Sequence, residues 1–339
     1  MVLAAALTLT ATSALAFDVA LPIDCTVGTD CAVQHYVDRD PGEGGADYMC
    51  GHQTYDGHDG IDFRIPDLRA MAEGVTVLAA ADGVVRAIRD GMEDRNVAET
   101  GVEAVANREC GNGVMIDHDG GWATQYCHMK MGSIRVKPGD PVSRGAQLGA
   151  VGLSGMTEFP HVHFTVYRDG HEIDPFAMEP RPAGAACRFA GDEGTAIWTP
   201  IAEKALVYRP AFVLNAGFAT GPVEMDDIET GAVGDVRVTP DSPALVFYGR
   251  AIGLEAGDVQ RLVITAPDGS VFASQEIEPL DRTKAQYMAF TGRKRRDTPW
   301  PAGTWQGRYA VIRDGAEVAF REVALVMPKA AGAGPAAAR

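Results

Sequence analysis

The distribution of histidine constrains this chain more than any other feature of its sequence. All eight histidines of the 339 residues lie between His35 and His171. Three short motifs hold four of them together with Asp62, namely HDGID at 58–62, YCH at 126–128 and HVH at 161–163. Zinc binds neutral imidazole and carboxylate readily, and a catalytic zinc keeps three protein ligands and one open position for water. The three motifs therefore indicate a zinc hydrolase.

The HVH motif is expected on a β-strand, because it runs into the β-branched and aromatic stretch Phe164–Tyr167. Side chains alternate between the two faces of a strand. His161 and His163 are therefore expected on one face, and Val162 is expected to point into the core.

The other two motifs also predict strands. His58 and Asp62 are four residues apart, and the period-two alternation over 61–65 places them on one face of a strand. The segment 112–128 predicts a hairpin with a turn at 119–121. Its second strand returns through alternating residues, which are Trp122, Thr124, Tyr126 and His128. Three strands are thus expected to bring histidine or carboxylate to one side of a sheet.

Each motif alone has an ordinary explanation. An isolated HxH pair is often a surface or core feature, and an isolated HxxxD is weaker still. His118 lies beside a turn and is expected to be structural, whereas His35, His52 and His171 have no spacing that singles them out. The order of the three motifs within about one domain's length is much more specific than its parts.

The stretch from about Gly51 to Phe176 resembles the lysostaphin-type zinc metallopeptidases, the M23 or LytM family, which cut peptides of the bacterial cell wall. The matching segments are GHDGIDF at 57–63, AAADGVV at 79–85, GNGVMIDH at 111–118, TQYCHM at 124–129, VKPGDPVSRGAQLGAVG at 136–152 and PHVHFTVYRDG at 160–170. Residue by residue, the resemblance implies one Zn²⁺ per chain on His58, Asp62 and His163. It implies that His128 and His161 are the two catalytic histidines.

Two departures from the family pattern affect the surroundings of the site. The family has a small Ser-Thr-Gly stretch before its HxH, where this chain has the bulkier segment 156–159, expected to form a rim of the groove. A charged insertion at 90–109 replaces a short turn and is expected to form a wall or lid. No ligand is missing, unlike in family members that act only as regulators.

The resemblance implies hydrolysis by metal-activated water, with a pKa for that water near ~7. His161 is expected to take the water proton or to orient the hydroxide, and His128 to stabilise the oxyanion or protonate the leaving amine. Which histidine does which stays open, and Tyr55 is expected to be structural. The expected substrate is the stem peptides of peptidoglycan, joined by direct D-alanyl cross-links.

Two rivals keep the same scaffold: a catalytically silent LytM-like wall-binding or activator protein, and a zinc peptidase that acts on proteins. A third interpretation, a biotin or lipoyl carrier with Lys130 as the modified residue, lacks the strand-turn-strand unit that such carriers have after the lysine.

Length suggests about two domains. Residues 1–16 are apolar, end in Ala-Leu-Ala and are similar to a signal peptide cleaved before Phe17. No other stretch has the ~18 uninterrupted apolar residues of a membrane span. We therefore expect an exported protein, periplasmic or secreted, without membrane insertion and of open oligomeric state.

Six cysteines fit an oxidising compartment. Cys110 and Cys127 flank the predicted hairpin, so we expect them to form a disulfide. The connectivity of the other four stays open; they are Cys25, Cys31, Cys50 and Cys187.

The net charge of −16 excludes two function classes. Such a surface repels nucleic acid and anionic membranes, so we expect no nucleic-acid partner. The one basic run, Arg293–Arg296, is expected to be a solvated loop, with contact to an anionic wall polymer as the sharper alternative.

The expected fold class is all-β: an antiparallel M23/LytM-type peptidase domain at 51–185, followed by a β-sandwich-like domain at 195–328. A cysteine-containing segment at 17–50 precedes them, and the Ala/Gly-rich tail 329–339 is expected to be disordered. Alternating runs predict strands of the sandwich at 206–208, 244–248, 262–265, 309–312 and 317–326. The sandwich has no catalytic constellation, so it either binds wall or a partner, or packs on the peptidase and shields it.

Overall fold

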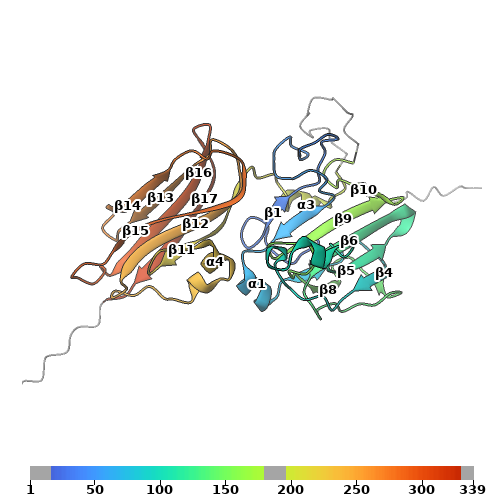
Figure 1. Ribbon diagram of the computed structural model, residues 1–339, viewed down its shortest axis with the longest axis horizontal. Helices are drawn as coiled ribbons and strands as arrows, with labels where there is room; N and C mark the ends of the chain where they lie inside the picture. Colours follow the sequence, from blue (N-terminus) through green and yellow to red (C-terminus); the bar gives the residue numbers. More distant parts are fainter. Residues whose placement is uncertain (1–16, 179–195, 330–339) are drawn as a thin grey trace, which may run out of the picture.

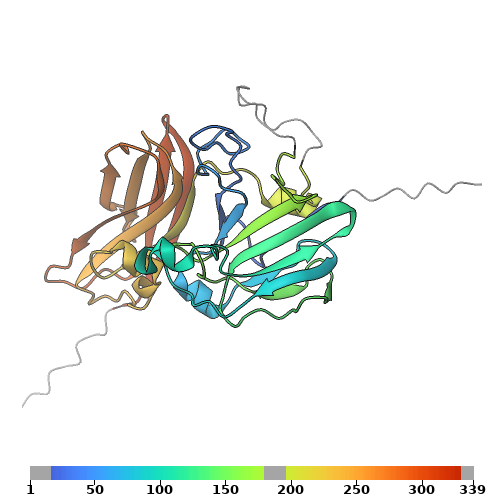
Figure 2. The same ribbon diagram turned by 45° about the vertical axis from the view of Figure 1, so that its right-hand side comes forward.

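The computed structural model describes residues 17–178 and 196–329, which form two β-rich bodies side by side (Figures 1 and 2). The expected all-β class is confirmed, since antiparallel strands dominate both bodies. The expected signal peptide at 1–16, the tail from 330 onward and Cys187 lie outside the described residues. Within the described ranges, no helix is both long and apolar enough to cross a membrane.

The first body is built on an eight-stranded antiparallel sheet, called here the first sheet, in the order β1-β2-β9-β6-β5-β4-β7, with β10 paired to β9. Its strands are β1 Ala32–His35, β2 Ile61–Arg64, β4 Gly83–Arg89, β5 Asn112–Asp117, β6 Trp122–Met129, β7 Pro141–Val142, β9 His161–Arg168 and β10 His171–Ile173. A separate two-stranded ribbon joins β3 Thr76–Leu78 to β8 Gln147–Ala150. The short helices of this body are α1 Leu68–Glu73, α2 Val97–Thr100, η1 Val102–Val105 and η2 Asp119–Gly121. The predicted hairpin is confirmed as β5 and β6.

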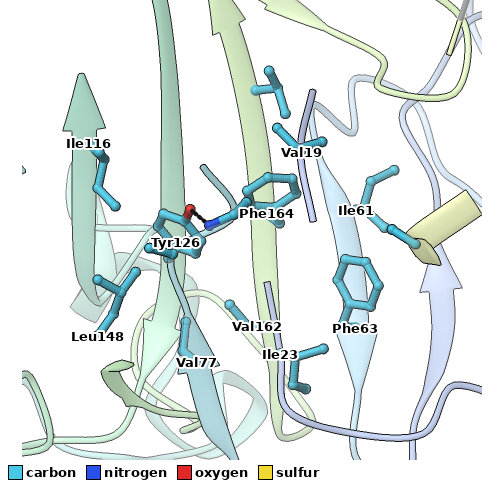
Figure 3. Packing of buried hydrophobic residues seen from close by; sticks show 14 of the residues in the cluster. Val19, Ile23, Ile61, Phe63, Val77, Ile116, Tyr126, Leu148, Val162 and Phe164 are labelled. Atoms are coloured by element: carbon cyan, nitrogen blue, oxygen red, sulfur yellow. Dashed lines mark hydrogen bonds between the residues drawn. The ribbon is translucent and has the colours of Figure 1, made fainter. Parts of the chain in front are cut away.

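Strand alternation gives the first sheet one apolar face. Val162 and Phe164 of β9 lie with Phe63 of β2 and Tyr126 of β6 in a fully buried cluster (Figure 3). The Tyr126 hydroxyl accepts a hydrogen bond of 2.8 Å from the Ala80 backbone N–H, so its polar end is satisfied inside the core. The opposite face of the same strands is consequently free for chemistry.

The second body, called here the sandwich, packs two antiparallel sheets against each other. One sheet contains β11 Phe212–Ala219, β12 Ala244–Leu254 and β15 Lys284–Lys294, and the other contains β14 Val271–Ile277, β13 Val259–Thr265, β16 Gly303–Arg313 and β17 Ala316–Met327. Phe247, Leu262, Trp305 and Tyr309 form the centre of its core. It also has the short helices α4 Met225–Glu229 and η3 Ala232–Gly234.

Four of the five runs predicted for this region lie within β12, β13, β16 and β17. The strand predicted at 206–208 is wrong, because Leu206 ends helix α3, Pro200–Ala205. Leu206 packs with Trp198 and Ala202 in the core of the first body. Its apolar run is therefore explained by burial of one helix face and not by strand pairing.

The two bodies are joined by a buried ion cluster. Arg64 of β2 and Arg250 of β12 are both completely buried, and both contact the Glu229 carboxylate at the end of α4. Arg64 also donates a hydrogen bond of 2.7 Å to the Gln34 side chain. A small apolar contact of Ala32 with Leu214 and Ile252 lies across the same junction. One carboxylate thus bridges a guanidinium from each body.

We predict that Glu229→Ala strongly destabilises the protein, because it leaves two buried guanidinium groups without their shared counter-charge. Breaking a buried ion pair from one side costs about 3–5 kcal/mol. The free energy of unfolding in urea measures this loss. The matched control is Arg261→Ala, which removes the exposed ion pair with Glu276 and should cost less than about 1 kcal/mol. Similar values for the two variants would contradict the role assigned to Glu229.

Candidate metal centre

The face of the first sheet opposite the core, called here the cleft face, collects the motif residues. In the register of β2 with β9, Asp62 lies opposite His163 and Arg64 lies opposite His161. The predicted alternation is confirmed, since Val162 is fully buried in the core between the two histidines. His58 differs from the prediction, because β2 begins only at Ile61. His58 instead reaches the site from the turn before the strand.

Three donor atoms converge on the cleft face. The Nε2 atom of His58 lies 3.2 Å from both Oδ1 of Asp62 and Nδ1 of His163, and the last two atoms are 2.9 Å apart. A tetrahedral ion with bonds of about 2.0–2.1 Å holds its ligand atoms roughly 3.3 Å from one another. His58 and Asp62 are buried, and His163 is partly exposed. The three side chains therefore fit a zinc-sized ion that keeps a side open to solvent.

Hydrogen bonds on the far side of each ring orient these ligand atoms. Nδ1–H of His58 donates to the Tyr36 carbonyl oxygen at 2.7 Å, which leaves Nε2 for an ion. Nε2 of His163 lies 3.0 Å from Thr165 Oγ1 and 3.0 Å from Asp59 Oδ1, which leaves Nδ1 of this ring for an ion. Outer contacts of this kind fix the tautomer and direction of a ligating imidazole.

His35 is part of this arrangement, although no motif in the sequence indicates it. Its Nδ1 lies 2.8 Å from Oδ2 of Asp62, the carboxylate oxygen that does not face the other two donors. The contact arises because β1 pairs with β2 and a register shift sets His35 opposite Asp62. No spacing along the chain encodes that pairing, so only the fold reveals the residue.

The two expected catalytic histidines lie next to the three donors. Nδ1–H of His161 donates to the Phe159 carbonyl at 2.9 Å, and Nδ1–H of His128 donates to the Ser154 carbonyl at 2.7 Å. The two ring centroids are 4.6 Å apart, and Nε2 of His161 is 3.2 Å from Oδ1 of Asp62. In each ring Nδ1 is engaged by a backbone carbonyl, which leaves Nε2 for other contacts.

A β-bulge places His128 on the cleft face. Asn112 pairs with Met129 but Val114 pairs with Tyr126, so Cys127 and His128 together oppose Gly113. Simple alternation, from which the hairpin was predicted, would put His128 beside Tyr126 in the core. The backbone of His128 instead adopts φ of 58°. Bulges next to functional sites commonly redirect a side chain in this way.

The bulge is held by its neighbours. The Cys110–Cys127 disulfide, predicted from the sequence, is confirmed, and the His128 backbone N–H donates to the Cys110 carbonyl at 2.8 Å. A Cβ atom on Gly113 would lie 2.6 Å from the Tyr126 carbonyl oxygen and 2.9 Å from Cys110 Sγ. Only glycine therefore fits opposite the bulge. The structure also joins Cys25 to Cys31, so those two thiols are not available as metal ligands.

The electrostatics of the cluster favour bound positive charge. Burial alone would raise the pKa of the Asp62 carboxyl, but His58 and His161 beside it hold that pKa well below its usual range. Burial alone would lower the pKa of His163, but Asp59 and Asp62 raise it to about 9. For His128, burial dominates and lowers the pKa well below its usual value, so this ring is neutral near pH 7.

The donors open into a cavity of about 500 Å³ with walls from both bodies. Met156 and Phe159 line it from the segment 156–159, which was expected to form a rim. Tyr55, half exposed, lines another side, with its ring centroid 4.7 Å from that of His58. The sandwich supplies a further wall through residues 253–255 and 283–285.

The insertion at 90–109 forms part of this cavity and is tied to the rim. Val97 and Val102 line the cavity. The Asn96 side chain donates to the Glu158 carbonyl at 2.9 Å, and Asp94 accepts hydrogen bonds from the backbone N–H groups of Leu153 at 2.8 Å and Met131 at 2.9 Å. The sequence left open whether this insertion is a wall or a lid of the groove. These contacts fit a wall.

Comparison with known proteins identifies the first body. Residues 56–175 match the family model "Peptidase family M23". The chain contains a domain of peptidase family M23. This domain includes all five motif residues on the cleft face.

The relatives match only part of this chain. The chain is 32% identical over 130 residues to cell division protein DipM of Caulobacter vibrioides, and 31% identical over 117 residues to peptidoglycan DD-endopeptidase ShyA of Vibrio cholerae. These matches cover 37% and 34% of this chain but only 18% and 22% of the relatives. The chain thus spans about a fifth of the length of the relatives that it matches.

Solved structures give matches of similar extent. A zinc-containing peptidase from Vibrio cholerae is 26% identical, with a TM-score of 0.27 over 42% of this chain and 38% of that one. The catalytic domain of the M23 protein EnpA from Enterococcus faecalis is 25% identical, with a TM-score of 0.31 over 44% of this chain and 92% of that one.

We predict that the Cys110→Ala/Cys127→Ala variant loses stability and also loosens His128. A bridge that closes a loop of 17 residues stabilises by about 3 kcal/mol on the chain-entropy model. Urea unfolding measures this loss, and NMR of the imidazole resonances reports the setting of His128. In the control, Cys25→Ala/Cys31→Ala, the His128 resonances should stay unchanged. An unshifted His128 signal in the first variant would refute the clamp.

Proposed function

We propose that the chain is a zinc-dependent endopeptidase that hydrolyses peptide cross-links of bacterial peptidoglycan, acting after export in the periplasm or outside the cell. The observation that carries the proposal is the convergence of the His58, Asp62 and His163 donor atoms within 3.2 Å of one another. Membership of the M23 domain in a peptidase family supports the reaction class. Two relatives named as peptidoglycan DD-endopeptidases support the substrate class.

The proposed mechanism assigns separate tasks to the five residues. His58, Asp62 and His163 would hold one zinc ion, which supplies an activated water and polarises the scissile carbonyl. His161 and His128 have Nδ1 engaged by backbone carbonyls, so with zinc bound their Nε2 atoms would accept the water proton and deliver it to the leaving amine. The silent-activator alternative gains no support from the donors, because none of the three is replaced or displaced.

We predict that substitutions of zinc ligands and of catalytic histidines differ in their effect on bound zinc. His163→Ala should lose both bound zinc and activity, because a two-ligand site holds the ion poorly. His161→Ala and His128→Ala should keep zinc but lose ~10²-fold or more in rate, the usual scale of general acid–base catalysis. Metal analysis of the purified variants checks both statements. If His161→Ala were empty of zinc and His163→Ala were full, the assignment within the HxH motif would be reversed.

We predict a distinct role for His35 as the residue that orients Asp62. His35→Ala should weaken zinc affinity ~10–100-fold, the usual cost of losing an outer contact to a ligand. Competition with a fluorescent chelator measures the affinity. His52→Ala is the matched control, because His52 lines the same cavity without a contact to the three donors. Equal zinc affinities of the His35→Ala variant and the wild-type protein would contradict this role.

The proposed bond is the direct D-alanyl link between neighbouring stem peptides. The segment 156–159 and the insertion 90–109 narrow the cavity with Met156, Phe159, Val97 and Val102. The chain is strongly acidic, whereas enzymes for glycine bridges are usually delivered by a basic targeting module. Direct cross-links in a periplasm suit this combination better than pentaglycine bridges do.

We predict that the mature protein releases monomeric stems from directly cross-linked peptidoglycan and leaves pentaglycine-bridged wall intact. Mass spectrometry of the digests identifies the fragments, and a chelator should abolish their release. His163→Ala is the control for contaminating hydrolases. Cleavage of pentaglycine alone would overturn the proposed bond, and cleavage that resists chelation would overturn the metal mechanism.

A further inference from the structure

A second cavity, of about 660 Å³, lies in the sandwich and is lined by cations and aromatic rings. The cations are the basic run Arg293–Arg296, and the rings belong to Phe272, Trp300 and Trp305. Arg293 and Lys294 end strand β15, and three of the four cations are exposed, as expected for a solvated run. All four also line the hollow.

The basic run lacks acidic partners. Among the described residues, none of its four cations forms an ion pair, whereas Arg261, Arg308 and Arg313 of the same sandwich all pair with carboxylates. Nε of Arg295 is buried and has no hydrogen-bond partner. Unpaired cations are unexpected in a chain with a net charge of −16, because carboxylates are abundant. The run is therefore ready to bind an anion.

The aromatic rings complete the cavity. The Phe272 ring lies 5.5 Å from that of Trp300 and 5.1 Å from that of Trp305, both edge to face, and the Arg293 guanidinium lies 5.2 Å from the Phe272 centroid. Trp300 and Trp305 are buried, 8% and 1% exposed. A ligand that enters the hollow can therefore contact Phe272, which is partly exposed, while the two buried tryptophans support that ring from below. They do not protrude far enough to insert into a lipid bilayer.

The second cavity lies far from the metal centre. Lys284, at the start of β15, lines the catalytic cavity, and Lys294, at the end of the same strand, lines the second one. Ten residues of extended strand span about 30 Å. The second cavity is thus a separate site, and only a polymer could contact both.

We propose that this second cavity binds acidic sugar residues of a polysaccharide. Guanidinium groups pair with carboxylates through two parallel hydrogen bonds, which suits sugar acids. The partly exposed Phe272 ring offers apolar surface to a sugar ring, and a hollow of this size matches small-ligand pockets of about 300–1,000 Å³. The proposal does not depend on the peptidase activity, because no residue of the metal centre takes part.

Titration with oligogalacturonate, followed by tryptophan fluorescence and calorimetry, tests the proposal on the full mature chain. We expect binding that weakens with salt, at least tenfold weaker binding by Arg293→Glu/Arg296→Glu, and no binding of neutral dextran oligosaccharides. Arg293→Gln/Arg296→Gln is a milder variant should the charge reversal impair folding. Arg135→Glu/Lys137→Glu carries the same charge change on exposed positions of the other body and should bind like the wild type.

Three results would overturn the proposal: no binding of oligogalacturonate, equal weakening by the Arg135/Lys137 control, or equal binding of dextran. Tighter binding of DNA or of phosphatidylglycerol vesicles through the same arginines would replace it with a different class of partner. Hydrolysis of a short soluble cross-linked peptide should be the same in both charge-reversed variants. A failure of the sugar site is therefore distinguishable from a failure of the proposed peptidase.

Discussion

The antiparallel pairing of β2 with β9 is the constraint on which the rest of the site depends. Its register sets Asp62 opposite His163 and Arg64 opposite His161 on the cleft face. The same pairing buries Phe63 beside Val162 on the core face. A slip of one residue would exchange the two faces, so the packing of the core also specifies which side chains meet at the metal centre.

Neighbouring elements then fix atoms that the pairing alone leaves free. One oxygen of the Asp62 carboxylate faces His58 and His163, and the other contacts His35. The bulge in β6 turns His128 toward His161. Glu229, which Arg250 also contacts, fixes Arg64 from the sandwich side, and the Arg64 guanidinium lies 4.3 Å from the centre of the Phe159 ring. The sandwich is thus coupled to the wall of the cavity through buried charge as well as by lining it.

The sequence predicted the all-β class, the hairpin, the Cys110–Cys127 bridge and the shared face of His161 and His163, because these depend on local alternation and short separations. It missed His35, because that contact arises from pairing of β1 with β2, and it placed His58 on a strand that begins three residues later. It put His128 on the right side by an argument that the bulge invalidates. The strand predicted at 206–208 was a helix end, since short apolar runs do not distinguish the two.

The central claim is that one ion sits among His58, Asp62 and His163, and anomalous X-ray diffraction of zinc-loaded crystals at the zinc edge tests it most directly. The account predicts one strong peak per chain about 2.0–2.2 Å from Nε2 of His58, Oδ1 of Asp62 and Nδ1 of His163. Zinc coordinated by His161 in place of His163, or no peak on the cleft face at full zinc loading, would contradict it.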